Sequence, residues 1–104
     1  MKYKTITDVF AEKKNVNIGY IVAGYPSTQF TKEFLTKLDK SAIDILEIGI
    51  PYSDPLADGK HIAEASFAAS QAGVTTDVVF NLLNSVKEKI HKPLVFLVYY
   101  NLVF

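Results

Sequence analysis

Hydrophobic positions along the chain follow two spacings, one typical of amphipathic helices and one typical of buried strands. Helical spacing predicts four helices, at residues 5–14, 27–40, 61–72 and 75–89. Short runs of β-branched, aromatic and other apolar residues predict three strands, at residues 17–23, 43–48 and 94–100. The predicted order is therefore a helix followed by β-α-β-α-α-β.

The residues between these segments are of the types that begin or end helices and strands. Gly24-Tyr25-Pro26 ends the first strand, because neither a strand nor a helix continues through this sequence. Ser27 is a natural N-cap for the second helix, and Thr75 or Thr76 can cap the fourth. Gly73 is expected to end the third helix.

Strands that alternate with helices indicate an α/β fold with a parallel sheet, covered by helices on at least one face. The helix positions expected to face the sheet are Phe30, Phe34, Leu35, Leu38, Val79, Leu82, Leu83, Val86 and Ile90. Little sequence follows the third strand to cover its apolar edge, and an exposed edge of this kind favours association. We therefore expect residues 1–104 to be the N-terminal portion of a larger single domain, or to self-associate.

Composition excludes several classes of function. Lys+Arg and Asp+Glu both number 11, and the basic residues are scattered lysines, so neither nucleic acid nor a membrane surface is an expected partner. The absence of cysteine excludes disulfides and thiolate metal sites. The N-terminus lacks the apolar run of a signal peptide, and the longest apolar run, residues 93–100, is too short to span a bilayer. We expect a soluble, cytoplasmic protein.

A carboxylate interrupts the second predicted strand. Glu47 lies within an apolar run, where an unpaired charge is costly unless it is paired or has a function. Gly49 then ends the strand, and the loop that follows it carries Asp58. Parallel α/β enzymes place acid–base groups at the carboxyl ends of strands and on the loops beyond them. The pattern predicts Glu47 and Asp58 as catalytic candidates.

Structural explanations compete with each of these assignments. Taken singly, Glu47 would more often be an ion-paired structural acid, and Asp58-Gly59 would more often be a simple turn. His61 and Glu64 share one helical face, but a lone pair of ligands is weak evidence for a metal, and no metal site is expected. Ser53 lacks the neighbours of a hydrolase nucleophile.

The sequence LEIGIPYSDPLADG, residues 46–59, resembles the signature of the tryptophan synthase alpha subunit family. Three further stretches are similar to that family, at residues 21–26, 72–74 and 99–104. The resemblance implies a parallel-strand (β/α)8 barrel of the TIM type, of which this chain would supply only the first three strands. Residues 1–104 would then be the N-terminal portion of a single TIM-barrel domain.

The resemblance also implies a reaction. The family cleaves indole-3-glycerol phosphate to indole and glyceraldehyde 3-phosphate, a retro-aldol lyase step that needs no cofactor of its own. By the match, Glu47 is the general acid/base that protonates the indole ring at C3. Asp58 matches the loop carboxylate that accepts the indole N–H and stabilises positive charge on the ring. The chemistry suits the residues, because protonating carbon requires a positioned acid and the developing cation requires a fixed anion.

The match extends to residues that would bind substrate and partner. The apolar wall of the indole site would be formed by Tyr20, Leu97 and Tyr99. The docking surface for the beta subunit would comprise Pro51, Tyr52, Asp54, Pro55, Leu56, Asn101 and Phe104. The resemblance implies an alpha2-beta2 heterotetramer in which pyridoxal phosphate belongs to the beta subunit alone. The family's phosphate-binding loops lie in the second half of the barrel, so the 104 residues alone are expected to be inactive.

Two positions depart from the family pattern. Lys60 replaces a proline common after the catalytic Asp-Gly, and we expect its ammonium to face water. Tyr25 replaces an acid in the Gly-x-Pro turn. An alternative function of another class stays open: a non-catalytic module that docks on and activates a partner enzyme through the loop at residues 51–56.

Overall fold

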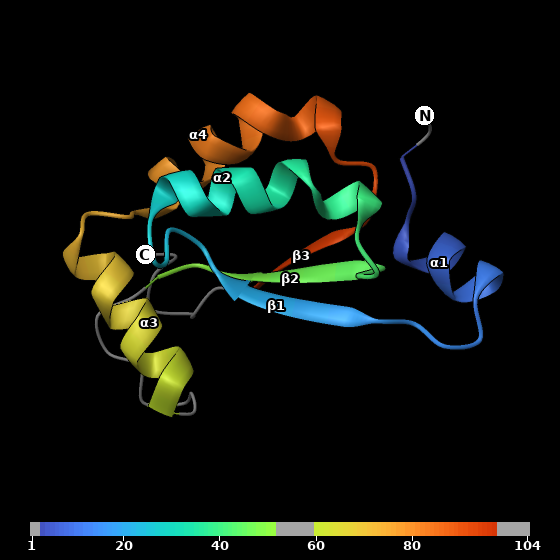
Figure 1. Ribbon diagram of the computed structural model, residues 1–104, viewed down its shortest axis with the longest axis horizontal. Helices are drawn as coiled ribbons and strands as arrows, with labels where there is room; N and C mark the ends of the chain where they lie inside the picture. The colour runs from blue at the N-terminus through green and yellow to red at the C-terminus, as the bar shows by residue number, and fades with distance from the viewer. Residues whose placement is uncertain (1–2, 52–59, 98–104) are drawn as a thin grey trace.

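A parallel sheet forms the centre of the computed structural model, which describes residues 3–51 and 60–97 (Figure 1). Its strands are β1 (Ile18–Val22), β2 (Ile45–Gly49) and β3 (Leu94–Leu97), in the order β1-β2-β3. The helices are α1 (Ile6–Glu12), α2 (Thr28–Thr36), α3 (Lys60–Gln71) and α4 (Thr76–Val86). Short 3-10 turns, η1 (Leu38–Lys40) and η2 (Lys87–Lys89), follow α2 and α4. The predicted order of elements is confirmed.

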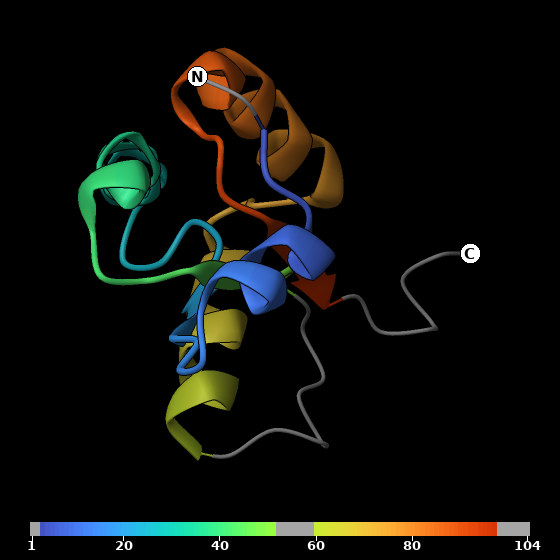
Figure 2. The ribbon, with the colours of Figure 1, turned by 90° about the vertical axis from the view of Figure 1, so that its right-hand side faces the viewer.

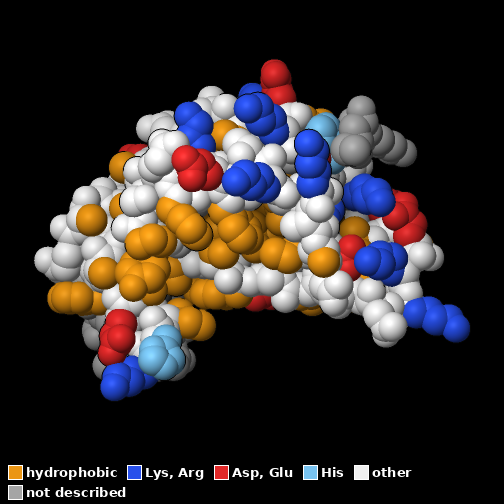
Figure 3. Space-filling model, viewed as in Figure 1, with side chains coloured by type: hydrophobic (Ala, Val, Ile, Leu, Met, Phe, Trp, Pro, Cys, Tyr) orange, Lys and Arg blue, Asp and Glu red, His pale blue; other side chains and the backbone are white. Residues whose placement is uncertain are grey.

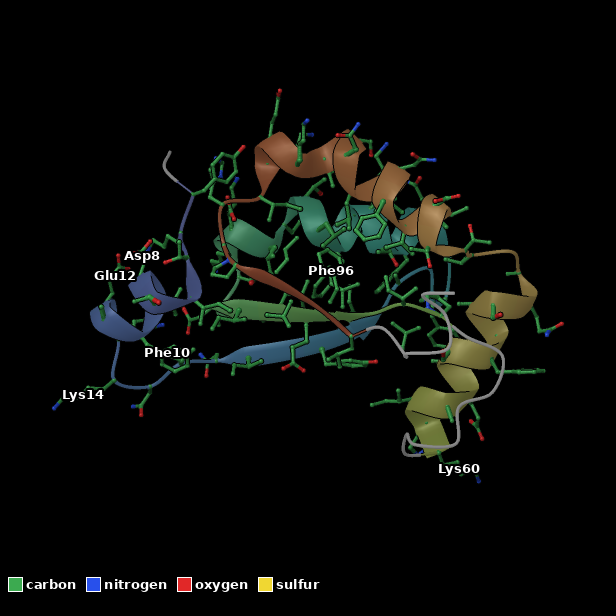
Figure 4. The ribbon with its side chains drawn as sticks, turned by 180° about the vertical axis from the view of Figure 1, so that it is seen from behind. Asp8, Phe10, Glu12, Lys14, Lys60 and Phe96 are labelled. Carbon is green, nitrogen blue, oxygen red and sulfur yellow. The ribbon has the colours of Figure 1, made fainter. Side chains whose placement is uncertain are left out.

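The two faces of the sheet have different surroundings. Leu46 and Ile48 point to the face covered by α2 and α4, and both are fully buried at 0% exposure. Figures 1 and 2 show these two helices side by side over that face, while α3 lies beside the carboxyl ends of the strands. Phe96 of β3 points toward the same helices and its ring lies 5.4 Å from that of Phe80 (Figure 4). Because successive strand side chains alternate, Glu47 points to the opposite face.

The predicted helix boundaries are held by side-chain caps. Ser27 Oγ accepts from the Phe30 N–H at 3.0 Å, and Thr75 Oγ1 accepts from the Val78 N–H at 3.3 Å. Gly73 follows α3 with a φ of 90°, a conformation that glycine adopts readily. Of the two threonines considered for α4, Thr75 is the cap.

The prediction that Phe30 faces the sheet is wrong. Phe30 is 50% exposed, whereas Leu35 and Leu38 are buried. The buried stripe of α2 and η1 passes through Thr31, Leu35 and Leu38, at i, i+4 and i+7, and Phe30 falls one residue to the side of it. The sequence pattern counted four apolar residues on one face, but a buried threonine takes the place of the first.

Asp44 ties α1 and β1 to the start of β2. Its carboxylate accepts from the Asn17 backbone N–H at 2.8 Å and from the Lys13 ammonium at 2.9 Å. Its own backbone N–H donates to the Asn17 carbonyl at 2.8 Å. The Asn17 N–H, and after it the Lys13 ammonium, hold the pKa of the Asp44 carboxyl below its ordinary value.

A second polar cluster lies at the same end of the sheet. Asp39 accepts from the His91 backbone N–H at 2.9 Å, and its other oxygen lies 2.7 Å from His91 Nδ1. Burial acts to raise the pKa of Asp39, but the His91 hydrogen bonds and charge outweigh burial and lower it. Tyr3 stacks on the His91 ring at 4.9 Å, and the Lys4 N–H donates to the His91 carbonyl. The cluster holds the N-terminal segment against the sheet.

Within the described residues, none of the helices combines the length and the apolar character needed to cross a membrane.

We predict that Asp44→Asn destabilises the chain at neutral pH and has less effect in acid. The pKa of Asp44 is lowered on folding, so its stabilisation is present above the ordinary value of 3.8 and is lost as pH falls through the lower folded pKa. Urea unfolding of both forms at about pH 7 and about pH 3 measures the difference. Glu88→Gln is the control, because Glu88 is exposed and forms no ion pair in the described part of the chain. An equal effect of Asp44→Asn at both pH values would contradict the assignment.

Candidate active site

Glu47 lies near the carboxyl end of β2, in a row of side chains that crosses the sheet. The register pairs Glu47 with Tyr20 of β1 on one side and with Val95 of β3 on the other. Paired residues of adjacent parallel strands share a face and lie about 4.8 Å apart. The Glu47 side chain is half-buried, between the aromatic ring of Tyr20 and the aliphatic side chain of Val95. The structure thus places a carboxyl group where α/β barrels carry their chemistry.

The ring of Tyr20 leans from β1 across β2. A Cβ built on Gly49 would overlap the Tyr20 hydroxyl and would lie only 3.0 Å from Tyr20 Cζ. Gly49 follows Glu47 by two positions and shares its face, so the phenol passes over the same surface as the catalytic candidate. The absence of a side chain at Gly49 therefore makes room for the aromatic wall beside Glu47. From the sequence, Gly49 was predicted only to end the strand.

Leu97 pairs with Gly49 across β2 and β3, so it also lies on the Glu47 face. It is 43% exposed at the carboxyl end of the sheet, where a ligand can reach it. The structure brings Tyr20, Glu47 and Leu97 to one face of the sheet, as the family resemblance implied. Their roles toward a substrate stay predictions.

Most of the remaining predicted site residues lie outside the described part of the chain. This holds for the catalytic candidate Asp58, for Tyr99 of the substrate wall, and for the docking residues Tyr52, Asp54, Pro55, Leu56, Asn101 and Phe104. Pro51 is described, and it is buried rather than presented as docking surface. The physical reason is that the chain is still attached to the sheet there, because the Ile50 N–H donates to the Leu97 carbonyl at 3.1 Å.

An apolar groove of about 360 Å³ lies between the end of β1, the start of α2 and the start of α3. Its lining comprises Tyr20, Ile21, Val22, Tyr25, Pro26, Phe30, His61, Ile62 and Ala65. Figure 3 shows apolar side chains gathered over this part of the molecule, with charged groups around it. Ile62 was not among the predicted site residues. It lies three residues before Ala65 in a predicted helix, and this spacing places both residues on one helical face.

The first turn of α3 is otherwise polar. Lys60 is exposed and its side chain extends away from the fold (Figure 4), in keeping with the expectation that it faces water. His61 and Glu64 are exposed as well. Among the described residues, no group of three or more His, Cys, Asp and Glu side chains is arranged to hold a metal ion.

Residues 6–104 match the model of the family described as tryptophan synthase alpha chain. The chain belongs to this family. The tryptophan synthase alpha chain of Campylobacter jejuni subsp. doylei is 53% identical to it over 92 residues, which are 88% of this chain and 36% of that protein. The alpha chain of Petrotoga mobilis is 47% identical over 96 residues, or 92% of this chain and 37% of that protein.

Solved structures agree with the sequence relatives. Tryptophan synthase subunit alpha from Campylobacter jejuni superposes with a TM-score of 0.80 at 52% identity, over 88% of this chain and 36% of that chain. The alpha subunit from Legionella pneumophila gives 0.84 at 32% identity, over 93% and 37%. This chain thus spans little more than a third of the family members that it matches. The predicted (β/α)8 class is confirmed, with three strands of the barrel seen here.

We predict that Gly49→Ala destabilises the fold by about 1 kcal/mol, because the new methyl group takes the place of the Tyr20 hydroxyl and the ring must turn from its preferred rotamer. Thermal unfolding followed by circular dichroism measures the loss. Tyr20→Leu, which removes the overlapping phenol, should recover part of the stability in the double variant.

Gly19→Ala is the matched control on β1. Its Cβ would meet three carbons of the Ile43 side chain at 3.0, 3.3 and 3.4 Å, and a shift of a few tenths of an ångström relieves these contacts without any atoms overlapping. Additive effects of Gly49→Ala and Tyr20→Leu would show that the two residues do not interact.

Proposed function

We propose that this chain forms the N-terminal part of a tryptophan synthase alpha chain, a lyase that cleaves indole-3-glycerol phosphate to indole and glyceraldehyde 3-phosphate. The observation that carries the proposal is the position of Glu47, half-buried at the carboxyl end of a barrel strand beside Tyr20, in a chain of this family. The complete reaction requires the rest of the barrel, so the 104 residues alone are inactive in this proposal.

Glu47 acts as the general acid/base. In its protonated form it delivers a proton to C3 of the indole ring, and the bond from C3 to the glycerol chain then breaks. The hydroxyl proton on the adjacent carbon leaves as the aldehyde forms, and the Glu47 carboxylate is the base that accepts it. A half-buried carboxyl beside apolar side chains is suited to both steps, because it is held in one place and is still reached from the open face of the sheet.

Asp58 supplies the second carboxylate. It accepts the indole N–H and stabilises the positive charge that the protonated ring acquires, which is an electrostatic role. Tyr20, Leu97 and Tyr99 provide the apolar wall against which the planar ring binds. The groove beside Tyr20 supports this assignment, since its lining is largely aromatic and aliphatic.

The proposed partner is the tryptophan synthase beta subunit, in an alpha2-beta2 assembly in the cytoplasm. Solved structures of tryptophan synthase from M. tuberculosis include a chain that this one matches with a TM-score of 0.83 at 31% identity. The lyase step described above uses only acid–base chemistry, so this chain needs no cofactor of its own, and pyridoxal phosphate belongs to the beta subunit.

The test is a chimera in which this chain replaces the matching third of the Campylobacter jejuni alpha chain. We predict that Glu47→Gln lowers indole release from indole-3-glycerol phosphate by about 10²-fold or more, because general acid–base catalysis is worth about that much. The melting temperature should change little, since the amide keeps the shape of the carboxyl group.

Glu64→Gln is the control, because it makes the same chemical change at an exposed position of α3. Its turnover should equal that of the unmodified chimera. Near-normal turnover of Glu47→Gln would contradict the lyase proposal. If that variant also activates the beta subunit fully, the alternative of a non-catalytic docking module through residues 51–56 gains support.

A further inference from the structure

We propose that Gly24 and Val74 form a positioning contact that fixes helix α3 against the carboxyl ends of β1 and β2, and thereby sets the geometry of the proposed lyase site. The inference rests on the proposed function. Neither residue touches substrate in this proposal; both act through the placement of α3.

The turn that contains Gly24 is fixed on two sides. The Ala23 N–H donates to the Gly49 carbonyl at 3.0 Å, which joins the end of β1 to the end of β2 just beyond Glu47. The Gly24 N–H donates to Thr31 Oγ1 at 2.9 Å, and Thr31 is only 2% exposed. A buried hydrogen bond of this kind is costly to break, because the N–H has no water to replace its partner. These two hydrogen bonds therefore hold the turn in a fixed position near Glu47.

Val74 packs directly against Gly24 in this turn and leaves no space for a side chain there. A Cβ built on Gly24 would lie 2.6 Å and 2.7 Å from the two methyl carbons of Val74. Val74 is 6% exposed, and its N–H donates to the Ala69 carbonyl at 3.0 Å, so the residue is tied to the last turns of α3. Any side chain at Gly24 would push Val74 away, and α3 with it.

The side chains of α3 itself that pack against the fold are small. Its buried positions are Ala65, Ser66 and Ala69, all of them small side chains. Its larger apolar residues, Ile62 and Phe67, are among the exposed ones. Val74, three residues beyond the end of α3, is larger than any of these buried side chains, and we expect its contact with Gly24 to fix the carboxyl end of the helix.

The position of α3 matters for the reaction because its first turn borders the site. His61 and Ile62 line the apolar groove together with Tyr20. In the sequence, Asp58 stands two residues before the first residue of this helix. Val74 is hydrogen-bonded to the last turn of α3 through Ala69, so we expect a displacement at Val74 to move the helix and, with it, the first turn. A misplacement of about 1 Å can cost about 10²-fold in rate.

The experiment compares two glycines with similar backbone but different surroundings. Gly24 has a φ of 82° and meets Val74, whereas Gly73 has a φ of 90° and a Cβ there would meet nothing within 4 Å. Alanine costs similar backbone strain at both positions. In the chimera described above, Gly24→Ala is expected to lower kcat by about tenfold or more. Gly73→Ala is expected to retain kcat, with a comparable loss of melting temperature from strain.

Val74→Ala in the Gly24→Ala background is the rescue, because it removes the two methyl groups that collide. The double variant should regain most of the lost kcat, whereas its melting temperature should stay low. If the contact had only a structural role, kcat and melting temperature would change together. If Gly24→Ala does not fold, Val74→Leu lengthens the side chain at the same contact and takes its place. Amide exchange of the chimera should then show lost protection in α3 and not in α4.

Equal kcat for Gly24→Ala and Gly73→Ala overturns the positioning role, as does a double variant with no recovery. These outcomes are distinct from failure of the proposed function. That failure would show itself as near-normal turnover of Glu47→Gln in the same chimera, whatever the glycine variants do.

Discussion

Strand β2 is paired on both edges, and its side chains must alternate between two faces; the rest of the molecule depends on this constraint. The pairing with β1 and β3 leaves its backbone groups satisfied, so the strand can be fully apolar where it meets the helices. Leu46 and Ile48 fill the space beneath α2 and α4, and that packing fixes the rotation of the strand. Glu47 is then presented on the other face, with no freedom to turn away.

The polar groups of the fold are divided between the two ends of the sheet. At the amino end, Asp39 and Asp44 accept hydrogen bonds from backbone N–H groups and interact with the side chains of His91 and Lys13, and the pKa of each carboxyl is lowered. At the carboxyl end, Glu47 lies among apolar side chains. One end uses charge to hold elements together, and the other keeps a carboxyl group available for proton transfer, as is usual for barrels of this class.

Local sequence signals were sufficient for the order of the elements and their approximate bounds. Helical and strand spacing, the Ser27 and Thr75 caps and Gly73 placed the boundaries to within a few residues. Contacts between distant residues could not be predicted in the same way. The overlap of Tyr20 with Gly49 depends on how a ring tilts across two strands, and no local pattern encodes that tilt. Phe30 was misassigned because a hydrogen-bonded threonine, Thr31, occupies the buried stripe in its place.

The small buried face of α3 limits how the sequence of this helix can change. Ala65, Ser66 and Ala69 pack against the rest of the fold, and a larger side chain at any of these positions would displace the helix from the sheet. Its outer face, which carries Lys60 and Phe67, has no such limit. Substitutions during evolution should therefore accumulate on the outer face of α3 only. A helix that borders a catalytic site can thus vary widely in sequence while its distance from the sheet stays constant.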